Sequence, residues 1–394
     1  MKITVIGAGI AGITAAYYAA KNGHEVTVYD LERYPAMRTS YANGAQVSVC
    51  NSEVWTTWSN IFKGVKWMFK KDAPLLIRPS LDFDKIIWLS KFLYHTANND
   101  YARNTIETIR MGLEARKLYN EICLSEHLYF DRKNCGILHF YKDKKYLNHA
   151  LNCQEMFVGN GCDWHTMSPE EVYKLEPALK NTPNILGGAF TASDWVGDIH
   201  KFCMNLAHVL ASKYNVKFQF ETNFKDIPHG YDALIVSAGV GSVKIAKLIG
   251  DKLPIYPVKG YSITISANDI KSHKAMPKIS LLDDEAKIVC SFLGDRLRVA
   301  GTAEFAGENY DIRRDRIEPL LNWTHINFPE INTSNYSSWA CLRPMTPNMM
   351  PIVGKSKYNN RTYYHTGHGH LGWTLAPQTA KSIVNLIERD YNER

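Results

Sequence analysis

Two glycine-rich segments, one near each end of the chain, have the spacing of loops that bind a dinucleotide. Residues 7–12 read GAGIAG and residues 367–372 read GHGHLG, so both follow the pattern G-x-G-x-x-G. In such a loop the first glycine forms a tight turn, the second lets the backbone approach a pyrophosphate, and the third lets the following helix pack on the preceding strand. The pattern therefore predicts a site for a phosphate-containing cofactor.

The first segment lies between elements that would position it for this task. An apolar strand is expected over 2–6, an alanine-rich helix through Lys21, the turn Asn22-Gly23, and a second strand over 25–29. Asp30 ends the second strand, where a carboxylate can accept hydrogen bonds from a ribose diol. The alternative is a glycine turn in an unrelated α/β protein, and the strand-loop-helix context argues against it.

The second segment helps to distinguish a nicotinamide cofactor from a flavin. It follows an expected strand over 362–366 and precedes an expected helix over 373–389. The free amides and positive dipole of a helix N-terminus suit the negative charge at N1 and the C2 carbonyl of a reduced flavin. An NAD enzyme has no obvious use for such an element, so FAD is the expected cofactor. A loop that serves packing alone is the alternative.

Three further side chains are candidates for a substrate site. Arg343 lies in the proline-stiffened segment 341–347, and a guanidinium can bind both oxygens of a carboxylate, although an isolated arginine is more often a surface residue. Tyr261 either lines the same pocket or belongs to the core, because it lies in an alternating strand. His368 is either a general base near the flavin or, as we favour, a structural turn residue.

Composition and charge restrict the class of protein. The 394 residues carry a formal net charge of +7, a mild excess that suits anionic substrates, phospholipid headgroups or nucleic acid without selecting one. The eight cysteines form no C-x-x-C pair or Cys/His cluster, so neither a metal site nor a disulfide framework is expected. There is no signal-peptide pattern, and no apolar run approaches the roughly 18 residues that cross a bilayer. We expect a cytoplasmic protein that at most lies on the inner face of the cell membrane.

The order of the expected elements indicates a divided chain. Strands are expected over 216–220 and 233–237, and residues 254–306 alternate like an antiparallel sheet. We expect an α/β fold of the α+β two-domain type, in which a Rossmann-like FAD-binding domain is interleaved with a substrate-binding domain of antiparallel sheet and helices. The expected ranges are 1–50, 141–250 and 336–394 for the FAD-binding domain, and 51–140 and 251–335 for the substrate-binding domain.

Residues 55–71 have the composition of a basic amphipathic helix. An apolar stripe is flanked by lysines, the stripe being Trp55, Trp58, Phe62, Val65 and Phe69 and the lysines Lys63, Lys66, Lys70 and Lys71. This pattern is typical of a helix at an anionic membrane surface. The alternative, which we slightly favour, is a helix packed on the substrate domain with a solvated basic face.

Several segments together resemble a known family. Residues 39–46 (TSYANGAQ), 257–262 (PVKGYS), 342–347 (LRPMTP) and 366–374 (TGHGHLGWT) resemble bacterial FAD-dependent D-amino acid dehydrogenase, within the D-amino acid oxidase and glycine oxidase superfamily. Residues 66–69 (KWMF) and 73–75 (APL) also match that family, and the agreement spans nearly the whole chain. Two places depart from the usual pattern. The family has Ala-Asn-Ala-Gly-Gln where this chain has residues 42–46 (ANGAQ), and Asp-Gly where it has Asn348-Met349. We expect an altered backbone path at the flavin and a modified turn behind Arg343.

The resemblance implies oxidative deamination of D-amino acids to 2-oxo acids and ammonia, with hydride passing from the substrate Cα to flavin N5 and electrons then passing to a quinone or another respiratory acceptor. It implies that Arg343 holds the substrate carboxylate. The expected catalytic residues are Arg343, Tyr261, His368 and Gln46. The expected cofactor-binding residues are Gly7, Gly9, Ile10, Ala11, Gly12, Asp30, Leu31, Thr39, Ser40, Asn43, Ala45, Gln46, Val47, Phe224, Ala238, Gly239, Gly367, Gly369, Leu371, Gly372, Trp373 and Thr374. Because the substrate amine must be neutral, activity is expected to rise from about pH 7 toward pH 9.

Two other functions remain open from the sequence. One is an oxidase of the same superfamily, such as a glycine or sarcosine oxidase, which would pass electrons to oxygen; we identify no lysine clearly poised at flavin N5 for that purpose. The other is a flavoprotein that acts on tRNA, which only the net charge supports. Since no RNA-binding module or arginine-aromatic surface is recognisable, no nucleic-acid partner is expected.

Overall fold

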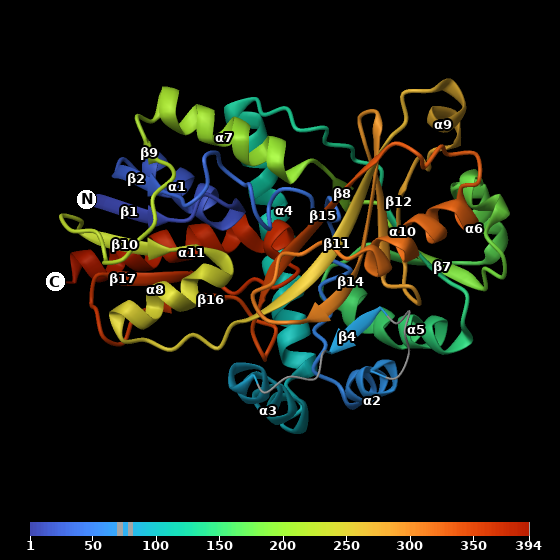
Figure 1. Cartoon of the computed structure of the whole chain (residues 1–394), viewed down its shortest axis with the longest axis horizontal. Coiled ribbons are helices and arrows are strands. Elements are labelled where there is room, and N and C mark those ends of the chain that lie inside the picture. The colour runs from blue at the N-terminus through green and yellow to red at the C-terminus, as the bar shows by residue number, and fades with distance from the viewer. Residues whose placement is uncertain (69–73, 78–81, 394) are drawn as a thin grey trace.

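Two large sheets and one short two-stranded sheet form the framework of the protein, which the computed structural model describes for residues 1–68, 74–77 and 82–393 (Figure 1). Of the two large sheets, the smaller has six strands in the order β16 (Ile352–Lys355), β17 (Thr362–Thr366), β10 (Ala233–Val236), β1 (Lys2–Ile6), β2 (Glu25–Tyr29) and β9 (Lys217–Gln219). All neighbours are parallel except β16 and β17. The strands expected over 2–6, 25–29 and 362–366 are confirmed at their stated bounds.

Each central strand of this sheet buries both of its faces. Ile3, Val5 and Ile235 pack against one layer of helices, whereas Ile6 and Leu234 pack against the other side, because successive side chains of a strand point to opposite faces. The first layer contains α1 (Ile10–Lys21), α4 (Tyr101–Glu126), α7 (Ile199–Lys213) and α11 (Gly372–Asn392), and α8 (Ser242–Ile249) covers the opposite face. This arrangement is a Rossmann-like unit.

The larger sheet has nine strands and is mainly antiparallel. Its order is β15 (Tyr336–Met345), β11 (Tyr256–Ser266), β14 (Arg296–Phe305), β13 (Ile288–Leu293), β12 (Ser280–Asp283), β5 (Ile137–Tyr141), β7 (Gly187–Thr191) and β6 (Trp164–Met167), while β4 (Leu75–Ile77) pairs with β14. Helix α10 (Arg314–Asn327) covers one face of β11 and β14, and Tyr261, Ile263 and Leu320 belong to the core between them. The expected combination of a Rossmann-like unit with a mainly antiparallel sheet and helices is confirmed.

The strands do not follow the expected domain ranges everywhere. Residues 141–250 and 336–394 were expected in the cofactor unit, but β6 and β7 pair with β5, and β15 pairs with β11. Conversely α4, from the range 51–140, packs on α11 of the cofactor unit. A strand's own sequence shows which of its faces are buried, but it does not show which sheet supplies the neighbouring strand. The expected domain ranges differ from the structure for this reason.

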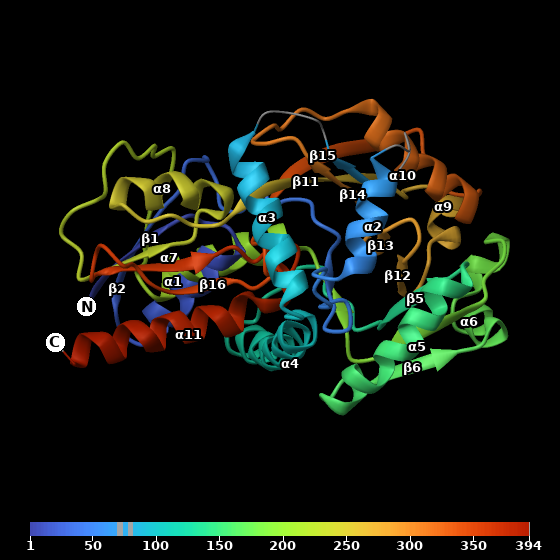
Figure 2. The same ribbon diagram turned by 90° about the horizontal axis from the view of Figure 1, so that it is seen from below.

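The remaining helices lie around the larger sheet. They are α2 (Trp58–Trp67), α3 (Phe83–Ala97), α5 (Lys144–Gly159), α6 (Pro169–Leu175) and α9 (Ile270–Ala275), with the 3₁₀ turn η1 (Pro177–Asn181). A second 3₁₀ turn, η2 (Gly239–Gly241), follows β10 of the smaller sheet. Helices α2 and α3 lie on one side of the molecule, at the bottom of Figure 1 and toward the viewer in Figure 2. None of the helices in the described ranges is long and apolar enough to cross a membrane.

Candidate active site between the two sheets

The first glycine loop follows β1 and has the close contacts that its spacing predicts. Gly7 has φ +107°, and a Cβ atom there would lie 2.5 Å from the carbonyl oxygen of Ser237. A Cβ atom at Gly12 would lie 1.7 Å from the Gly7 carbonyl oxygen, so only glycine allows α1 to begin this close to the loop. Gly9 is less crowded, and Ala238 and Gly239 follow the neighbouring strand β10 beside Gly7.

The late glycine loop lies directly beside the first one. A Cβ atom at Gly372, where α11 begins, would be 3.8 Å from the side chain of Ile10, where α1 begins. Gly367 and Gly369 have φ +73° and +57°, and the amide of Gly369 donates to the carbonyl oxygen of Pro344 at 3.0 Å. Two helix N-termini therefore meet at the carboxyl ends of parallel strands, where open α/β sheets bind their ligands.

Asp30 lies at the end of β2, as expected, and its carboxylate is bound to the backbone of the loops. One oxygen accepts from the amide of Ala8 at 2.5 Å and the other from the amide of Glu32 at 2.8 Å. Burial is the largest influence on its pKa and raises it. Leu31 is about half exposed, and Phe224 contacts Tyr29 edge-on with ring centres 5.4 Å apart. These residues surround the end of β2. In folds with this motif, the adenosine half of the dinucleotide binds at that end.

Residues 39–47 run between the glycine loops and the larger sheet. The Thr39 hydroxyl donates to the carbonyl oxygen of Leu342, and the Ser40 hydroxyl accepts from the amide of Ile10. The Asn43 side chain accepts from the amide of Ala45. Gln46 donates from its side-chain amide to Ser280 and to the Leu281 carbonyl, and Val47 is buried in strand β3 (Gln46–Val47), which pairs with β8 (Trp195–Val196). The segment connects the cofactor loops to the sheet that carries Arg343.

Both departures from the family pattern have an unusual backbone. Ala45 has φ +64° and Met349 has φ +64°, and these are the two positions at which the resembled family carries glycine. Residues other than glycine adopt this left-handed conformation at a cost of roughly 1–2 kcal/mol. At Gly44 the situation is reversed, since a Cβ atom there would lie 2.4 Å from Val289. Ala45 and Met349 therefore adopt a conformation that glycine adopts more readily, and the altered backbone path and the modified turn behind Arg343 stay predictions.

Arg343 is half-buried on the face of β15 that looks toward these loops. Its guanidinium lies over Gly260, where a Cβ atom would be 2.3 Å from Nη2, and Nη1 donates to the carbonyl oxygen of Thr302 at 3.0 Å. Burial lowers the pKa of Arg343, yet a guanidinium remains charged at neutral pH. Among the described residues no carboxylate forms an ion pair with it. A cation that is partly withdrawn from solvent and has no anionic partner favours an anionic ligand at this position.

Two aromatic residues that the sequence did not assign to the substrate site complete the surroundings of Arg343. His370 stacks on Trp55, with ring centres 4.7 Å apart and planes at 18°. Burial, and then the nearby charge of Arg343, lower the pKa of His370 to about 3. The ring is therefore neutral at physiological pH and offers Nδ1, which has no hydrogen-bond partner in the described part of the chain.

Arg298 is a further buried cation that was missed. It lies on β14, donates from Nη1 to the carbonyl oxygen of Asn43 at 3.2 Å, and has a pKa that burial lowers to about 10. Its position opposite Thr264 and Ser291 places it on the same face as Ser262 and Gly260. No signal in the sequence distinguishes it, because its neighbours in space are brought together only by sheet pairing.

Tyr261 does not lie in this pocket. In the β11–β15 register Val258 is opposite Arg343 and Tyr261 is opposite Ala340, so Tyr261 points to the opposite face of the sheet. Its hydroxyl donates to Glu304, and its ring belongs to the core beneath α10. The expectation that Tyr261 lines the pocket with Arg343 is wrong, and the alternative core assignment holds.

His368 has the environment of a structural residue. Its Nε2 shares the hydroxyl of Thr379 with His365, at 2.9 and 2.8 Å, and the two imidazole rings meet edge to face. Burial lowers the pKa of His368 to about 4, so the ring is a poor proton acceptor at neutral pH. Trp373 is also buried, and its indole N–H donates to the carbonyl oxygen of Ala45, which helps to fix residues 39–47.

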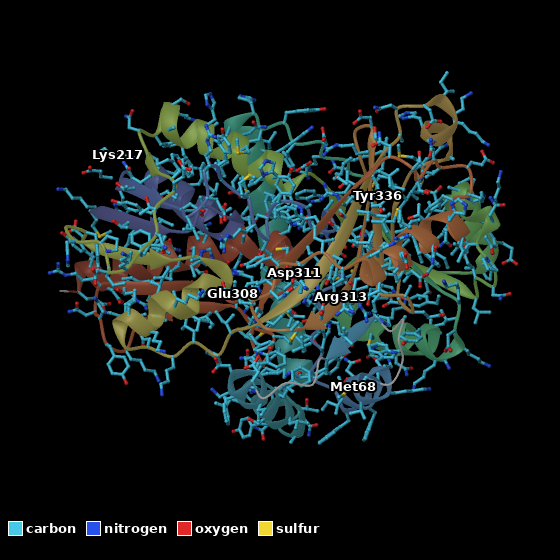
Figure 3. All side chains as sticks on the ribbon, in the orientation of Figure 1. Met68, Lys217, Glu308, Asp311, Arg313 and Tyr336 are labelled. Carbon is cyan, nitrogen blue, oxygen red and sulfur yellow. The ribbon has the colours of Figure 1, made fainter. Side chains whose placement is uncertain are left out.

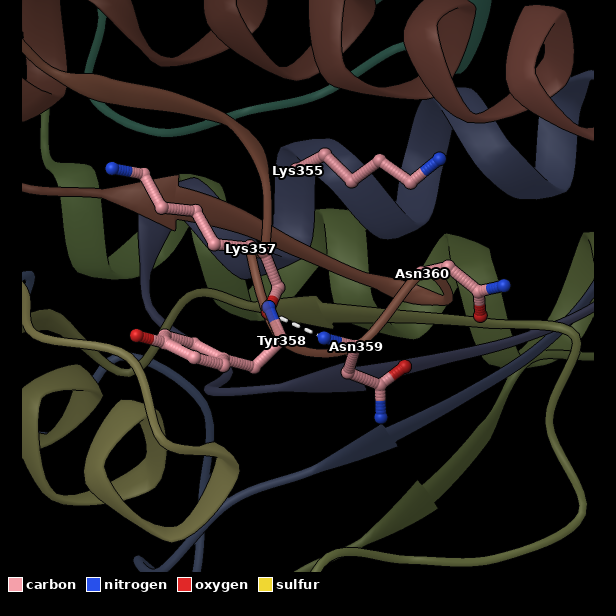
Figure 4. A pocket seen from close by; sticks show the side chains of 6 residues that line it. Lys355, Lys357, Tyr358, Asn359 and Asn360 are labelled. Atoms are coloured by element: carbon pink, nitrogen blue, oxygen red, sulfur yellow. Dashed lines mark hydrogen bonds between the residues drawn. The ribbon is translucent and has the colours of Figure 1, made fainter.

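A surface pocket elsewhere has no part in this site. It is lined by the β16–β17 turn, with Lys357, Tyr358 and Asn359 among its residues (Figure 4). This turn precedes β17, whereas Gly367 follows β17, so the two lie at opposite ends of the strand.

Comparison with known proteins gives the family. The model of the family described as FAD dependent oxidoreductase matches residues 2–386. The chain belongs to the FAD-dependent oxidoreductases. It is 45% identical to D-amino acid dehydrogenase 3 of Mesorhizobium japonicum, covering 99% of this chain and 97% of that one, and 35% identical to a D-amino acid dehydrogenase of Paramagnetospirillum magneticum, covering 98% and 95%.

Solved structures share the fold of this FAD-dependent oxidoreductase. Glycine oxidase from Geobacillus kaustophilus has a TM-score of 0.77 at 16% identity, covering 98% of this chain and 94% of that one. The L-alpha-glycerophosphate oxidase of Mycoplasma pneumoniae, solved with FAD bound, has a TM-score of 0.74 at 18% identity, covering 98% and 94%. FAD is thus the cofactor, as expected from the two glycine loops.

The residues between the sheets fit this cofactor. Several buried polar atoms there have no hydrogen-bond partner within the described ranges, namely Gln46 Oε1, Ser237 Oγ, Arg298 Nε and Thr302 Oγ1. Buried polar atoms almost always have a hydrogen-bond partner. These four atoms therefore indicate that a polar ligand binds here and forms hydrogen bonds with some of them. The N-termini of α1 and α11 supply backbone donors for phosphate and for a negatively charged ring edge.

Proposed function

We propose that this enzyme oxidises the C–N bond of a D-amino acid to give a 2-oxo acid and ammonia, and that it passes the electrons to a quinone. The observation that carries the proposal is the half-buried guanidinium of Arg343, which has no carboxylate partner within the described residues and lies on the face toward the glycine loops. A substrate carboxylate is the ligand that two parallel N–H donors fit best. The names of the two relatives given above support the D-amino acid as substrate.

The protein side of the reaction is mainly positioning. Arg343 would bind the carboxylate, and the fixed Gly260 surface beneath it would limit how the guanidinium can turn. Neutral His370 and Trp55 would cover the substrate and exclude water, and the carbonyl oxygen of Thr302 would hold the guanidinium in place. The bound flavin supplies the two-electron acceptor at N5. Because His368 and His370 remain neutral with low pKa values, the substrate amine loses its proton before transfer without help from a strong protein base.

The test is to mix the purified flavoprotein with a panel of D- and L-amino acids without oxygen. Reduction of the flavin is measured as loss of its absorbance. D-Amino acids are expected to bleach the flavin, and L-amino acids are not. Arg343→Lys keeps the charge but loses the paired donors, so the substrate concentration for half-maximal reduction should rise by about 100-fold, equivalent to ~3 kcal/mol. Arg103→Lys, in an exposed ion pair on α4, is the matched control. Bleaching by L-amino acids alone, or an unchanged Arg343→Lys variant, would contradict the proposal.

The exposed faces of α2 and α3 support a quinone as the acceptor. Trp58, Phe62 and Val65 are 50%, 69% and 52% exposed, so these members of the apolar stripe face solvent. Helix α2 packs on β4 of the larger sheet near its buried Gly64. Phe69, Lys70 and Lys71 lie outside the described residues. Helix α3 presents more apolar side chains on the same side of the molecule, namely Phe83, Ile86, Ile87 and Tyr94. Met68, labelled at the lower edge of Figure 3, marks the end of α2 on this side.

We propose that an anionic membrane surface binds this side, where exposed Lys66 and Lys91 accompany the apolar residues. Sedimentation with vesicles that contain phosphatidylglycerol should carry the enzyme down, and Phe62→Ser combined with Ile86→Ser should abolish this. Tyr358→Ser, at an equally exposed aromatic residue on the β16–β17 turn, should not. Equal sedimentation of the double variant would disprove the surface. Production of peroxide in air at the rate of quinone reduction would favour the oxidase instead.

A further inference from the structure

Glu53, His149 and Cys153 place three different metal-binding groups together outside the substrate site. One ligand atom from each lies within 4.8 Å of the others. His149 and Cys153 are four residues apart on α5 and therefore share one face of that helix, and Glu53 approaches from the segment that follows residues 39–47. The sequence showed no such cluster, because Glu53 is nearly 100 residues from its partners.

The distances suit a tetrahedral ion of the zinc type. Zinc binds nitrogen at about 2.0–2.1 Å and thiolate sulfur at about 2.3 Å, which places the two atoms about 3.6 Å apart in a tetrahedron. Cys153 Sγ and His149 Nε2 are 3.6 Å apart. Glu53 Oε1 and Oε2 are 2.9 and 3.2 Å from the same nitrogen, slightly less than the roughly 3.3 Å of an ideal oxygen–nitrogen edge. Small side-chain rotations suffice to admit the ion.

Metal sites need neighbouring groups that orient the ligands and a route by which the ion can enter, and both are present here. The Tyr101 hydroxyl donates to Glu53 at 2.9 Å and lies 3.6 Å from Cys153 Sγ, so it orients the carboxylate beside the thiol. Cys153 is buried, whereas the His149 side chain is about half exposed and leaves a route from solvent. The combination of sulfur, nitrogen and oxygen donors selects zinc over calcium or magnesium, which prefer oxygen alone.

We propose that Glu53, His149 and Cys153 bind one zinc-type divalent cation, which ties α5 to the segment that covers the substrate site. Glu53 is two residues from Trp55, whose ring stacks on His370 beside Arg343. Val54, between them, is fully buried in a core cluster with Trp88 and Met345. An ion that holds Glu53 therefore holds the backbone that positions Trp55.

The experiment measures zinc itself and needs no turnover, so it remains informative if the proposed substrate is wrong. Holoenzyme is freed of metal with a chelator, desalted, and titrated with zinc chloride against a chromogenic chelator. One zinc per chain is expected. Cys153→Ser and His149→Gln should weaken binding by at least about tenfold, since each removes a ligand. Zinc should raise the melting temperature of the wild type, and the two variants should lose that rise.

Matched controls use a cysteine and a histidine away from the cluster. Cys123→Ser changes a half-buried thiol on α4, and His208→Gln changes an exposed imidazole on α7. Both should bind zinc like the wild type. Retention of FAD and an unchanged far-ultraviolet circular dichroism spectrum check that each variant is folded. No zinc binding by the wild type, or equal binding by the ligand variants, would overturn the proposal.

Discussion

The guanidinium of Arg343 rests on the backbone of Gly260, so closely that a methyl group at position 260 would stand 2.3 Å from Nη2 and 2.4 Å from Cζ. The two residues lie on neighbouring strands, with Val258 directly opposite Arg343 and Gly260 opposite Cys341. The position of the cation is thus set by the absence of a side chain on the adjacent strand. Glycine is needed here for space, since Gly260 does not have a positive φ.

Gly260→Ala should therefore impair substrate binding while leaving the charge of Arg343 intact. The added methyl group must push the guanidinium away from its position, and misplacement of a binding group by about 1 Å can cost about 100-fold. We expect KM for the D-amino acid to rise by about 10- to 100-fold with FAD still bound. Gly354→Ala, where a methyl group would meet no atom within 4 Å, is the control. Steady-state kinetics measure KM for both variants. An unchanged KM in Gly260→Ala would show that Gly260 does not set the position of the Arg343 guanidinium.

Gly44 and Val289 form a second close contact, at the segment that departs from the family pattern. A methyl group at Gly44 would overlap the Val289 side chain, so Gly44→Ala should destabilise the protein by about 1–3 kcal/mol. Combining it with Val289→Ala should recover part of this loss, because the second change removes the colliding methyl groups. Chemical denaturation of the four proteins measures the coupling free energy. Simple additivity of the two changes would show that the contact does not limit the backbone path.

The buried histidines predict loss of stability in acid. Burial lowers the pKa of His368 to about 4 and that of His370 to about 3, compared with an ordinary value of 6.5, so the folded state binds these protons less readily than the unfolded state. Their stabilising contribution is complete above about pH 6.5 and declines as the pH falls toward 4, by about 1.4 kcal/mol per pH unit for each residue. Urea unfolding at pH 7.5, 6 and 5 measures the slope. His368→Asn should reduce it, and equal slopes would contradict the assignment.

The pH dependence of activity should come from a different group. Because His368 and His370 titrate near pH 4 and below, neither changes protonation between pH 7 and 9. The rise in rate expected over that interval then belongs to the substrate amine. A pH profile of anaerobic flavin reduction should keep its shape in His368→Asn. A rising limb that disappears in that variant would restore His368 as a general base.

The glycine loops, their strands and the cofactor were predictable because the signals are local. Gly12 contacts Gly7 within the same loop, so the spacing of the two carries this constraint, whereas Gly7 also contacts Ser237 and Ala238, which only the sheet brings beside it. Tyr261 was not assignable in this way, because alternation along β11 shows that two faces exist but only the pairing with β15 shows which one carries Arg343.

The same limit applies to residues that meet from distant parts of the chain. Trp55 and His370 are more than 300 residues apart, and neither has a neighbour in sequence that predicts their stacking. The expected domain ranges were wrong at β6, β7 and β15 for a related reason. The sequence of one strand does not show which other strand pairs with it in a sheet. By contrast, the resemblance pointed to Arg343 directly, because Arg343 and the prolines that follow it form a continuous motif.

The stack of Trp55 on His370 predicts how the enzyme selects its substrate. The indole lies over a neutral imidazole that is close enough to Arg343 to feel its charge, so it is placed to limit the space around a substrate whose carboxylate would bind Arg343, as proposed above. Trp55→Ala should enlarge this space and also remove apolar contacts from small substrates. We expect kcat/KM for D-alanine to fall and the preference for D-phenylalanine over D-alanine to rise by about tenfold, a shift typical of a changed hydrophobic pocket. Trp55→Phe, which keeps an aromatic ring, should show a smaller shift, and Trp58→Ala, at an exposed position on α2, should show none. If Trp55→Ala lowers kcat/KM for both substrates equally, the indole positions the active site without selecting among side chains.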